Sequence, residues 1–183
     1  LADSYARGIL QVSREKESSL ILMGWRGKRT FKQNILGTVL DEVIWGSDSP
    51  VMVGKLAFPL DGMERVLLLI PEGAVSPAAL RRVLQANLTL AHELNVPCEI
   101  LAHKTYLHAI NEIISRNYKD VKIQVKEMVG SLHPRDLETS VRSDLVVIPG
   151  FGSRKRFITN LGNLPERLAD SFPGNLIILH FDR

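Results

Sequence analysis

Short apolar runs alternate with amphipathic segments along the whole chain. Between residues 2 and 17, Tyr5, Ile9 and Val12 recur at helical spacing, with charged residues on the other face. Buried strands are predicted from apolar runs at 20–23, 51–53, 65–70, 99–102, 144–148 and 175–179. Residues 121–126 alternate between apolar and polar, which is typical of a half-buried edge strand. Strands that alternate with helices predict an α/β protein.

Capping residues predict where the helices begin. Thr38 can cap a helix that ends at the turn sequence "GSDSP", and Ser76 followed by Pro77 begins another that runs to about residue 95. Further helices are predicted at 106–116, at 134–142 and after Asn163. The chain from residue 65 onward therefore contains five strands with four helices between them, which predicts a doubly wound parallel sheet.

One strand–loop–helix unit occurs twice. The segment "SLILMGWRGKRTFKQNILGTVLDEV" aligns without a gap on "DLVVIPGFGSRKRFITNLGNLPERL". Gly27 falls on Gly152 and Gly37 falls on Gly162, so the offset is 125 positions throughout. Residue 1 then corresponds to residue 126, where the second copy has already built three strands.

The repeat predicts two unequal domains. Residues 1–54 are expected to be the C-terminal portion of a first domain, and residues 65–183 a complete second one. The stretch "GKLAFPLDGME", with two glycines and a proline, predicts a linker at 55–64. Since the chain begins with Leu1 and already in a helical pattern, we expect it to be part of a longer protein.

Composition limits the function classes. The 183 residues carry a net charge of only +3, which gives no reason to expect nucleic acid as a partner. The single cysteine, Cys98, excludes an internal disulfide and is expected to fill packing space. No apolar run approaches the roughly 18 residues that a membrane-spanning helix needs.

The stretch "GWRGKRTFKQNILGT" has the composition of a phosphate-binding loop. It joins an apolar strand to a helix N-terminus, where backbone N–H groups and the helix dipole favour an anion. Its three glycines, Gly24, Gly27 and Gly37, allow an anion to approach the backbone closely, and Thr38 adds a hydroxyl donor. Positive charge comes from Arg26, Lys28, Arg29 and Lys32, while Trp25 can flank a ligand or pack under a partner.

The spacing of this loop resembles the signature of the universal stress protein family, G-x2-G-x9-G-[S/T]. Gly24, Gly27, Gly37 and Thr38 match it completely. The resemblance implies a five-stranded sheet of order 3-2-1-4-5, the adenine nucleotide alpha hydrolase-like fold, with copies that pair through their last strands. It also implies ATP, ADP or AMP as the ligand of this loop in the full-length protein, and binding and regulation more than catalysis.

The second copy departs from the family pattern. Glu72 stands where the family usually has an aspartate at the adenine side of the ligand, Pro149 replaces the first glycine, and Asn163 replaces the Ser/Thr. The degenerate second site would consist of Glu72, Gly150, Gly152, Arg154, Gly162 and Asn163. The phosphate half of a site thus lies in the first copy, and the base half lies in the second copy beside an altered loop.

The resemblance favours a regulatory adenine-nucleotide- or anion-binding domain. By analogy with the family, we expect the cytoplasmic tail of a sodium (cation)/proton antiporter of the cell membrane. Its partners would be the transporter portion of the same polypeptide and itself, either as a homodimer or through pairing within the chain. A stand-alone tandem stress protein and a dimerisation module that binds no nucleotide are the alternatives.

Catalysis is the least favoured function. The five histidines are scattered without metal-ligand spacing, and no Ser/His/Asp constellation can be argued. We therefore expect neither a metal site nor an enzyme. A distant alternative is a nucleotide hydrolase, which would have to release phosphate from ATP.

Overall fold

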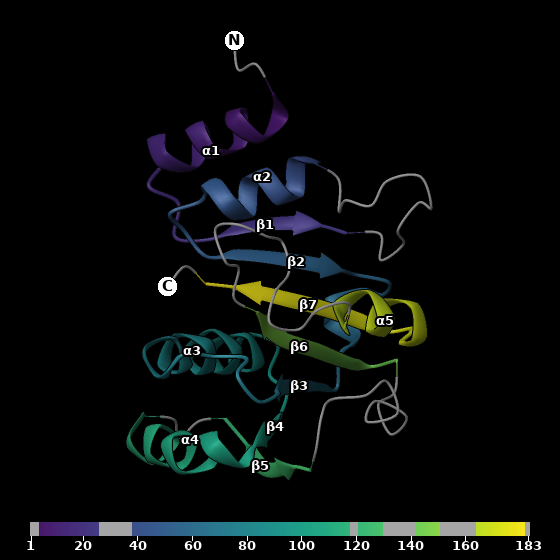
Figure 1. Ribbon diagram of the computed structural model, residues 1–183. Coiled ribbons are helices and arrows are strands. Elements are labelled where there is room, and N and C mark those ends of the chain that lie inside the picture. Colours follow the sequence, from purple (N-terminus) through teal and green to yellow (C-terminus); the bar gives the residue numbers. More distant parts are fainter. Residues whose placement is uncertain (1–3, 26–37, 118–120, 130–141, 151–163, 182–183) are drawn as a thin grey trace.

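The strands form one sheet of seven in the part of the chain that the computed structural model describes (Figure 1). The described residues are 4–25, 38–117, 121–129, 142–150 and 164–181. The strands are β1 (Ile21–Gly24), β2 (Val51–Lys55), β3 (Arg65–Ile70), β4 (Cys98–His103), β5 (Ile123–Met128), β6 (Asp144–Gly150) and β7 (Asn175–His180). Their order across the sheet is β1-β2-β7-β6-β3-β4-β5.

Helices flank the sheet where the sequence predicts them. They are α1 (Tyr5–Glu15), α2 (Thr38–Gly46), α3 (Pro77–Glu93), α4 (Lys104–Asn117) and α5 (Leu164–Ser171), with a 3-10 turn at Leu60–Gly62. Ser76 caps α3 by accepting a hydrogen bond from the backbone N–H of Ala79, and Pro77 occupies the first turn. The helix predicted at 134–142 and the cap predicted at Asn163 fall outside the described residues, apart from residue 142.

The strands of residues 65–180 have the order that the resemblance implies. They run β5-β4-β3-β6-β7 across the sheet, which is 3-2-1-4-5 in chain order, and each neighbouring pair is parallel. The sheet as a whole has seven strands, because β2 pairs with β7 in antiparallel orientation and β1 follows beyond β2. The expected pairing through the last strands is thus present, and it satisfies the backbone groups at the outer edge of β7.

The pairs β1–β2 and β6–β7 have the same register. Ile21 lies opposite Val51, and at the offset of 125 this pair corresponds to Val146 opposite Leu176. The remaining partners of β1 follow the same rule. The offset found in the sequence therefore also relates the pairing of the strands.

Side chains reinforce the antiparallel junction of β2 and β7. Lys55 donates a hydrogen bond of 2.7 Å from Nζ to the carbonyl of Phe172, just beyond α5. The fully buried Asn175 accepts from the N–H groups of Ala57 and Phe58 at 2.7 and 2.9 Å, and donates back to the carbonyl of Phe58 at 2.9 Å. The start of the predicted linker is thus held against the last strand.

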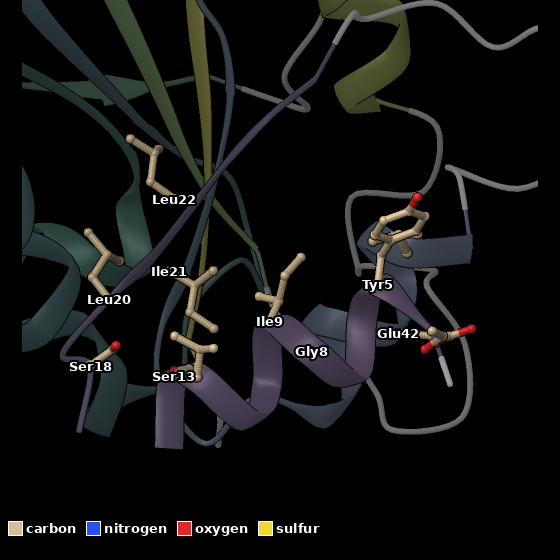
Figure 2. Close-up of a pocket in the computed structure, with 12 residues that line it drawn as sticks. Tyr5, Gly8, Ile9, Ser13, Ser18, Leu20, Ile21, Leu22 and Glu42 are labelled. Atoms are coloured by element: carbon tan, nitrogen blue, oxygen red, sulfur yellow. The ribbon is translucent and has the colours of Figure 1, made fainter. Parts of the chain in front are cut away.

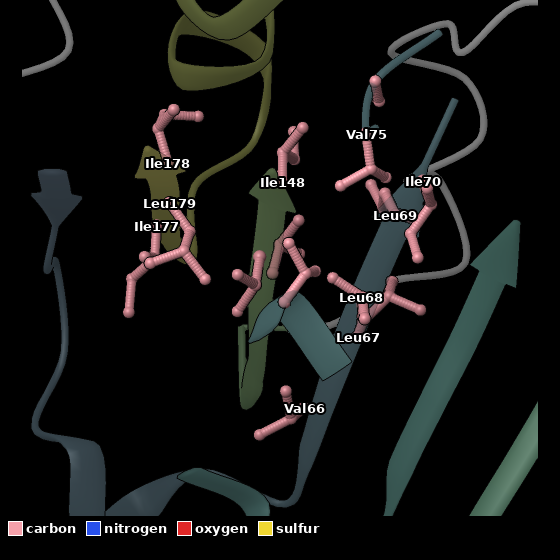
Figure 3. Packing of buried hydrophobic residues seen from close by; sticks show 14 of the residues in the cluster. Val66, Leu67, Leu68, Leu69, Ile70, Val75, Ile148, Ile177, Ile178 and Leu179 are labelled. Carbon is pink, nitrogen blue, oxygen red and sulfur yellow. The ribbon is translucent and has the colours of Figure 1, made fainter. Parts of the chain in front are cut away.

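The core lies on both faces of the central strands. Every residue from Val66 to Ile70 is buried, as are all residues of β6 and β7, and Figure 3 shows these side chains packed together. Strands that are covered on both faces need near-continuous apolar runs, which explains why the sequence pattern identified them. The side of α3 that includes Leu80, Leu84 and Leu88 is buried, as its helical spacing predicts.

A row of charged side chains crosses the four adjacent strands β6, β3, β4 and β5, close to the amino-terminal ends of β3 and β6. Arg65 of β3 forms ion pairs with Asp144 of β6 and Glu99 of β4, and Lys126 of β5 donates to the same Glu99 at 2.7 Å. Glu99 and Asp144 are buried. Burial raises the pKa of Glu99, but the hydrogen bonds from Lys126 and Arg65 lower it by more, so that this pKa lies below its ordinary value.

At the other edge of the sheet, α1 packs closely on α2. A Cβ at Gly46 would lie 2.5 Å from Cδ1 of Leu10, so a side chain there would force Leu10 to move. Arg14 donates to the carbonyl of Gly46 at 3.0 Å and to Asp48 at 3.2 Å. These contacts hold α1 against α2 at this end of the sheet (Figure 1).

Candidate functional site

The predicted phosphate loop begins at the carboxyl end of β1. Gly24 is the last residue of that strand, and the N–H of Trp25 donates to the carbonyl of Gly54 in β2 at 2.8 Å. The chain returns as α2, which begins at Thr38. The other residues expected in this site, Arg26, Gly27, Lys28, Arg29 and Gly37, lie outside the described residues.

Gly24 is not explained by crowding. A Cβ at this position would meet no described atom within 4 Å, and the backbone there is not in the left-handed region. The simple explanation of Gly24 as a turn or packing residue therefore gains no support from the described neighbours. The residue is exposed at the end of β1, where the backbone is accessible.

Trp25 is partly buried and packs against the hydrophobic core. Its backbone bond to Gly54 places the indole directly after the end of β1. The sequence left open whether Trp25 flanks a ligand or packs under a partner. The contact seen here is with the core of the same chain.

The degenerate site begins at the carboxyl ends of β3 and β6, which are neighbouring parallel strands. Glu72 follows the end of β3 and is 75% exposed in its side chain, and Gly150 ends β6. Gly73 adopts a φ of +68°, which a side chain would disfavour, and so turns the chain sharply after Glu72. Gly152, Arg154, Gly162 and Asn163 lie outside the described residues.

The structure adds His103 to this second group. It ends β4, and its Nε2 lies 4.0 Å from Oε2 of Glu72, while its Nδ1 lies 3.0 Å from Oγ1 of Thr105. In the sequence, His103 is one of five scattered histidines that show no metal-ligand spacing. Its position as the last residue of the strand after β3 was the available signal, since the ends of parallel strands meet at one edge.

Tyr106 anchors the turn that carries Glu72. Its hydroxyl donates to the carbonyl of Val75 at 3.0 Å and accepts from the N–H of the same residue at 3.3 Å. Both Tyr106 and Val75 are buried. These two hydrogen bonds therefore hold the turn against α4.

The two halves of the predicted site do not meet within the described chain. Because β2 and β7 are antiparallel, β1 and β2 run in the opposite direction to β3 and β6. The carboxyl ends of β1 and β2 therefore lie at the end of the sheet where β3 and β6 begin. Gly24 is consequently remote from Glu72 and Gly150. A complete site at Gly24 needs base-contacting groups from elsewhere than Glu72.

A groove of about 1050 Å³ lies between α1 and β1. Tyr5, Ile9 and Val12 of α1 line one side. Leu20, Ile21 and Leu22 line the other, and Ile21 points toward α1 (Figure 2). Its lining is mostly apolar, which distinguishes it from the cation-rich loop predicted at the end of the same strand. Among the described residues, no three His, Cys, Asp or Glu side chains are grouped to hold a metal ion. None of the described helices is both long and apolar enough to cross a membrane.

Comparison with known proteins finds similarity to one family in the first part of the chain. Residues 1–55 match the universal stress protein family. The chain is also 24% identical over 190 residues to the Na(+)/H(+) antiporter NhaS5 of Synechocystis sp.. That match covers 96% of this chain but 26% of the antiporter, so the chain spans about a quarter of that relative's length.

Solved structures share the fold over almost the whole chain. A universal stress protein from Archaeoglobus fulgidus superposes with a TM-score of 0.59 at 21% identity, covering 93% of this chain and 64% of its own. A Pseudomonas aeruginosa protein of unknown function gives a TM-score of 0.63 at 15% identity, covering 98% of this chain and 69% of its own. Because both sequence identities are low, the structural similarity shows only that the fold is shared.

Proposed function

We propose that the chain is a regulatory domain that binds an adenine nucleotide or a related anion at the loop from Gly24 to Thr38. The match of residues 1–55 to the universal stress protein family supports this proposal. The protein that it regulates is a cation/proton antiporter. The domain binds and transmits, and it performs no catalysis of its own.

The observation that carries this proposal is the geometry around Gly24. The parallel pair β1–β2 ends there, the glycine is exposed with no described atom near its Cβ position, and a nine-residue helix begins at Thr38 on the return of the chain. A strand end followed by a glycine-rich loop and a helix N-terminus is the arrangement by which α/β folds bind phosphate. The sequence supplies the compensating cations, with Arg26, Lys28, Arg29 and Lys32 in this loop.

The antiporter assignment is supported by the relative that the chain resembles. NhaS5 of Synechocystis sp. is a Na(+)/H(+) antiporter, and the similarity to it extends over 96% of this chain. A regulatory domain acts through linkage, because a ligand that binds one arrangement of the protein more tightly shifts the population toward that arrangement. The continuous sheet through β2 and β7 would transmit such a shift between the two parts of the chain.

Titration calorimetry with ATP, ADP and AMP tests the ligand. The titrations compare this chain with the full-length polypeptide, in each case with the Gly37→Val variant. Gly62→Val is a matched control, since Gly62 is exposed and a Cβ there meets no described atom. We expect nucleotide binding by the full-length protein that Gly37→Val weakens at least about tenfold and Gly62→Val leaves unchanged. Equal binding by both variants would contradict the proposed site.

A second candidate function is supported by the junction of β2 and β7. Five residue pairs join these strands, and the side chains of Lys55 and Asn175 add bonds across the junction. A module whose role is to hold two domains together would need only this junction, with the glycine loops as inherited turns. Absence of nucleotide binding by both the chain and the full-length protein would favour this function.

A further inference from the structure

The carboxyl end of β1 is tied to the end of β2 by a backbone hydrogen bond. The N–H of Trp25, directly after Gly24, donates to the carbonyl of Gly54 at 2.8 Å. At the other end of the same strand pair, the N–H of Ile21 donates to the carbonyl of Pro50 at 2.9 Å. The position of the backbone at the end of β1 therefore depends on where β2 places Gly54.

The segment that follows Gly54 is held by one side chain of the second half of the sheet. Oδ1 of Asn175 accepts from the N–H groups of Ala57 and Phe58 at 2.7 and 2.9 Å. Its Nδ2 donates to the carbonyl of Phe58 at 2.9 Å and contacts Sδ of Met63 at 3.4 Å. The amide is fully buried, and all four of its hydrogen-bonding positions are used on this one segment. It therefore holds the segment in a single arrangement.

The internal repeat shows that this contact runs in one direction only. At the offset of 125, Asn175 corresponds to Pro50, since 175 − 125 = 50. A proline side chain has no donor or acceptor, so the first half has no counterpart of this amide. The second half, whose own loop departs from the family pattern at Pro149, thus supplies a side chain that supports the end of β2 in the first half.

We propose that Asn175 is a positioning residue for the end of β1, where the proposed anion-binding loop begins. Its amide fixes the backbone at residues 57–58, this segment fixes the carbonyl of Gly54, and that carbonyl fixes the N–H of Trp25. A residue of the second half thereby acts on a site in the first half without being a ligand. The effect on ligand binding rests on the proposed function, whereas the positioning of β1 does not.

Amide exchange of this chain, measured residue by residue with NMR on isotope-labelled protein, tests the positioning. The variant is Asn175→Ala. The control is Asn87→Ala, which truncates another buried asparagine of the second half, whose Nδ2 donates to Val83 within its own helix. With Asn175→Ala we expect the N–H of Trp25 to exchange at least about tenfold faster, and that of Ile21 to change by less than about threefold. The control should change the ratio of these two rates by less than about twofold.

The comparison of the two amides separates positioning from general destabilisation. Equal acceleration of Trp25 and Ile21 in Asn175→Ala would overturn the proposal, because Asn175 would then stabilise the sheet only as a whole. An unchanged Trp25 amide would overturn it as well.

A conservative variant keeps the inference testable where Asn175→Ala does not fold. Asn175→Asp retains an oxygen that can accept from both N–H groups at residues 57–58. We expect the ratio of the Trp25 and Ile21 exchange rates to stay within about twofold of its value in the unaltered chain. A ratio that rises by about tenfold in this variant would overturn the proposal.

Titration of the full-length polypeptide with ATP separates this inference from the proposed function. We expect Asn175→Ala to weaken binding at least about threefold, and Asn175→Asp to bind as the unaltered protein does. Binding that Asn175→Ala leaves unweakened would overturn the effect on the site while the proposed function stands. An unaltered polypeptide that binds no nucleotide would refute the proposed function, and the Trp25 amide alone would then decide whether Asn175 positions β1.

Discussion

Lys55 donates a hydrogen bond of 2.7 Å to the backbone carbonyl of Phe172, and so joins the end of β2 to the residue that follows α5. The two residues lie 117 positions apart in the sequence. Burial lowers the pKa of Lys55, an effect that Asp170 partly offsets. The ammonium group is therefore held at the junction of the two halves of the sheet at some cost of desolvation.

Lys55→Met should weaken this junction. The variant keeps much of the aliphatic stem but leaves the carbonyl of Phe172 without this donor, so we expect a loss of about 1 kcal/mol in the free energy of unfolding. Urea denaturation measures it. Lys122→Met, at an exposed lysine, is the control and should change stability by less than about 0.5 kcal/mol. Equal effects of the two variants would show that the Lys55 bond contributes nothing.

Two buried asparagines should respond oppositely to the same substitution. Asn175 satisfies three backbone groups of Ala57 and Phe58, whereas Oδ1 of the buried Asn87 has no hydrogen-bond partner among the described residues. Asn175→Leu should cost about 2 kcal/mol, because it removes the partner of three backbone groups at this partly buried junction. Asn87→Leu should leave stability unchanged or raise it by up to about 1 kcal/mol. Thermal and urea unfolding of both variants decide this, and similar losses would contradict the account.

Glu99 should make stability depend on pH on the acid side. Its folded-state pKa is depressed, so the stabilisation is fully present above its unfolded pKa of about 4.3 and is lost as pH falls through the folded value. Glu99→Gln should cost about 2 kcal/mol at pH 7 and less at pH 3. Glu127→Gln, at an exposed glutamate of β5, is the control. A loss from Glu99→Gln that is the same at both pH values would refute the role of its ionisation.

Cys98 should be inert in the folded protein. Burial, together with the nearby Glu99, raises the pKa of its thiol to about 12. Since the thiolate is the reacting species, alkylation by iodoacetamide at pH 8 should be slower than in urea by about a hundredfold or more. Mass spectrometry of timed reactions measures the ratio. Fast alkylation without denaturant would show that the start of β4 opens in the folded protein.

Much of the fold could be predicted from the sequence because the central strands are buried on both faces. Their apolar runs are uninterrupted, and the Ser76–Pro77 pair marks the start of α3 unambiguously. The edge position of β5 followed from its alternation. These features are local, so neighbouring residues carry the information.

The remaining features depend on contacts between distant residues. The two glycines and the proline of 54–64 predicted a linker at 55–64, but Lys55 belongs to β2, and Ala57 and Phe58 are bonded to Asn175. Helical spacing predicted α1 without indicating that Tyr5 and Val12 would be exposed. The approach of His103 to Glu72 depends on the register of β3 and β4, which no local pattern encodes.

The proposed regulation of an antiporter is tested most directly by sodium-driven proton exchange in membrane vesicles that contain the full-length polypeptide. Exchange is recorded with and without ATP for the unaltered protein, for Gly37→Val and for the Gly62→Val control. We predict that ATP changes the half-saturating sodium concentration at least about threefold in the unaltered protein and the control, and not in Gly37→Val. Exchange that ignores ATP in all three proteins, or that responds equally in all three, would contradict nucleotide regulation through this loop.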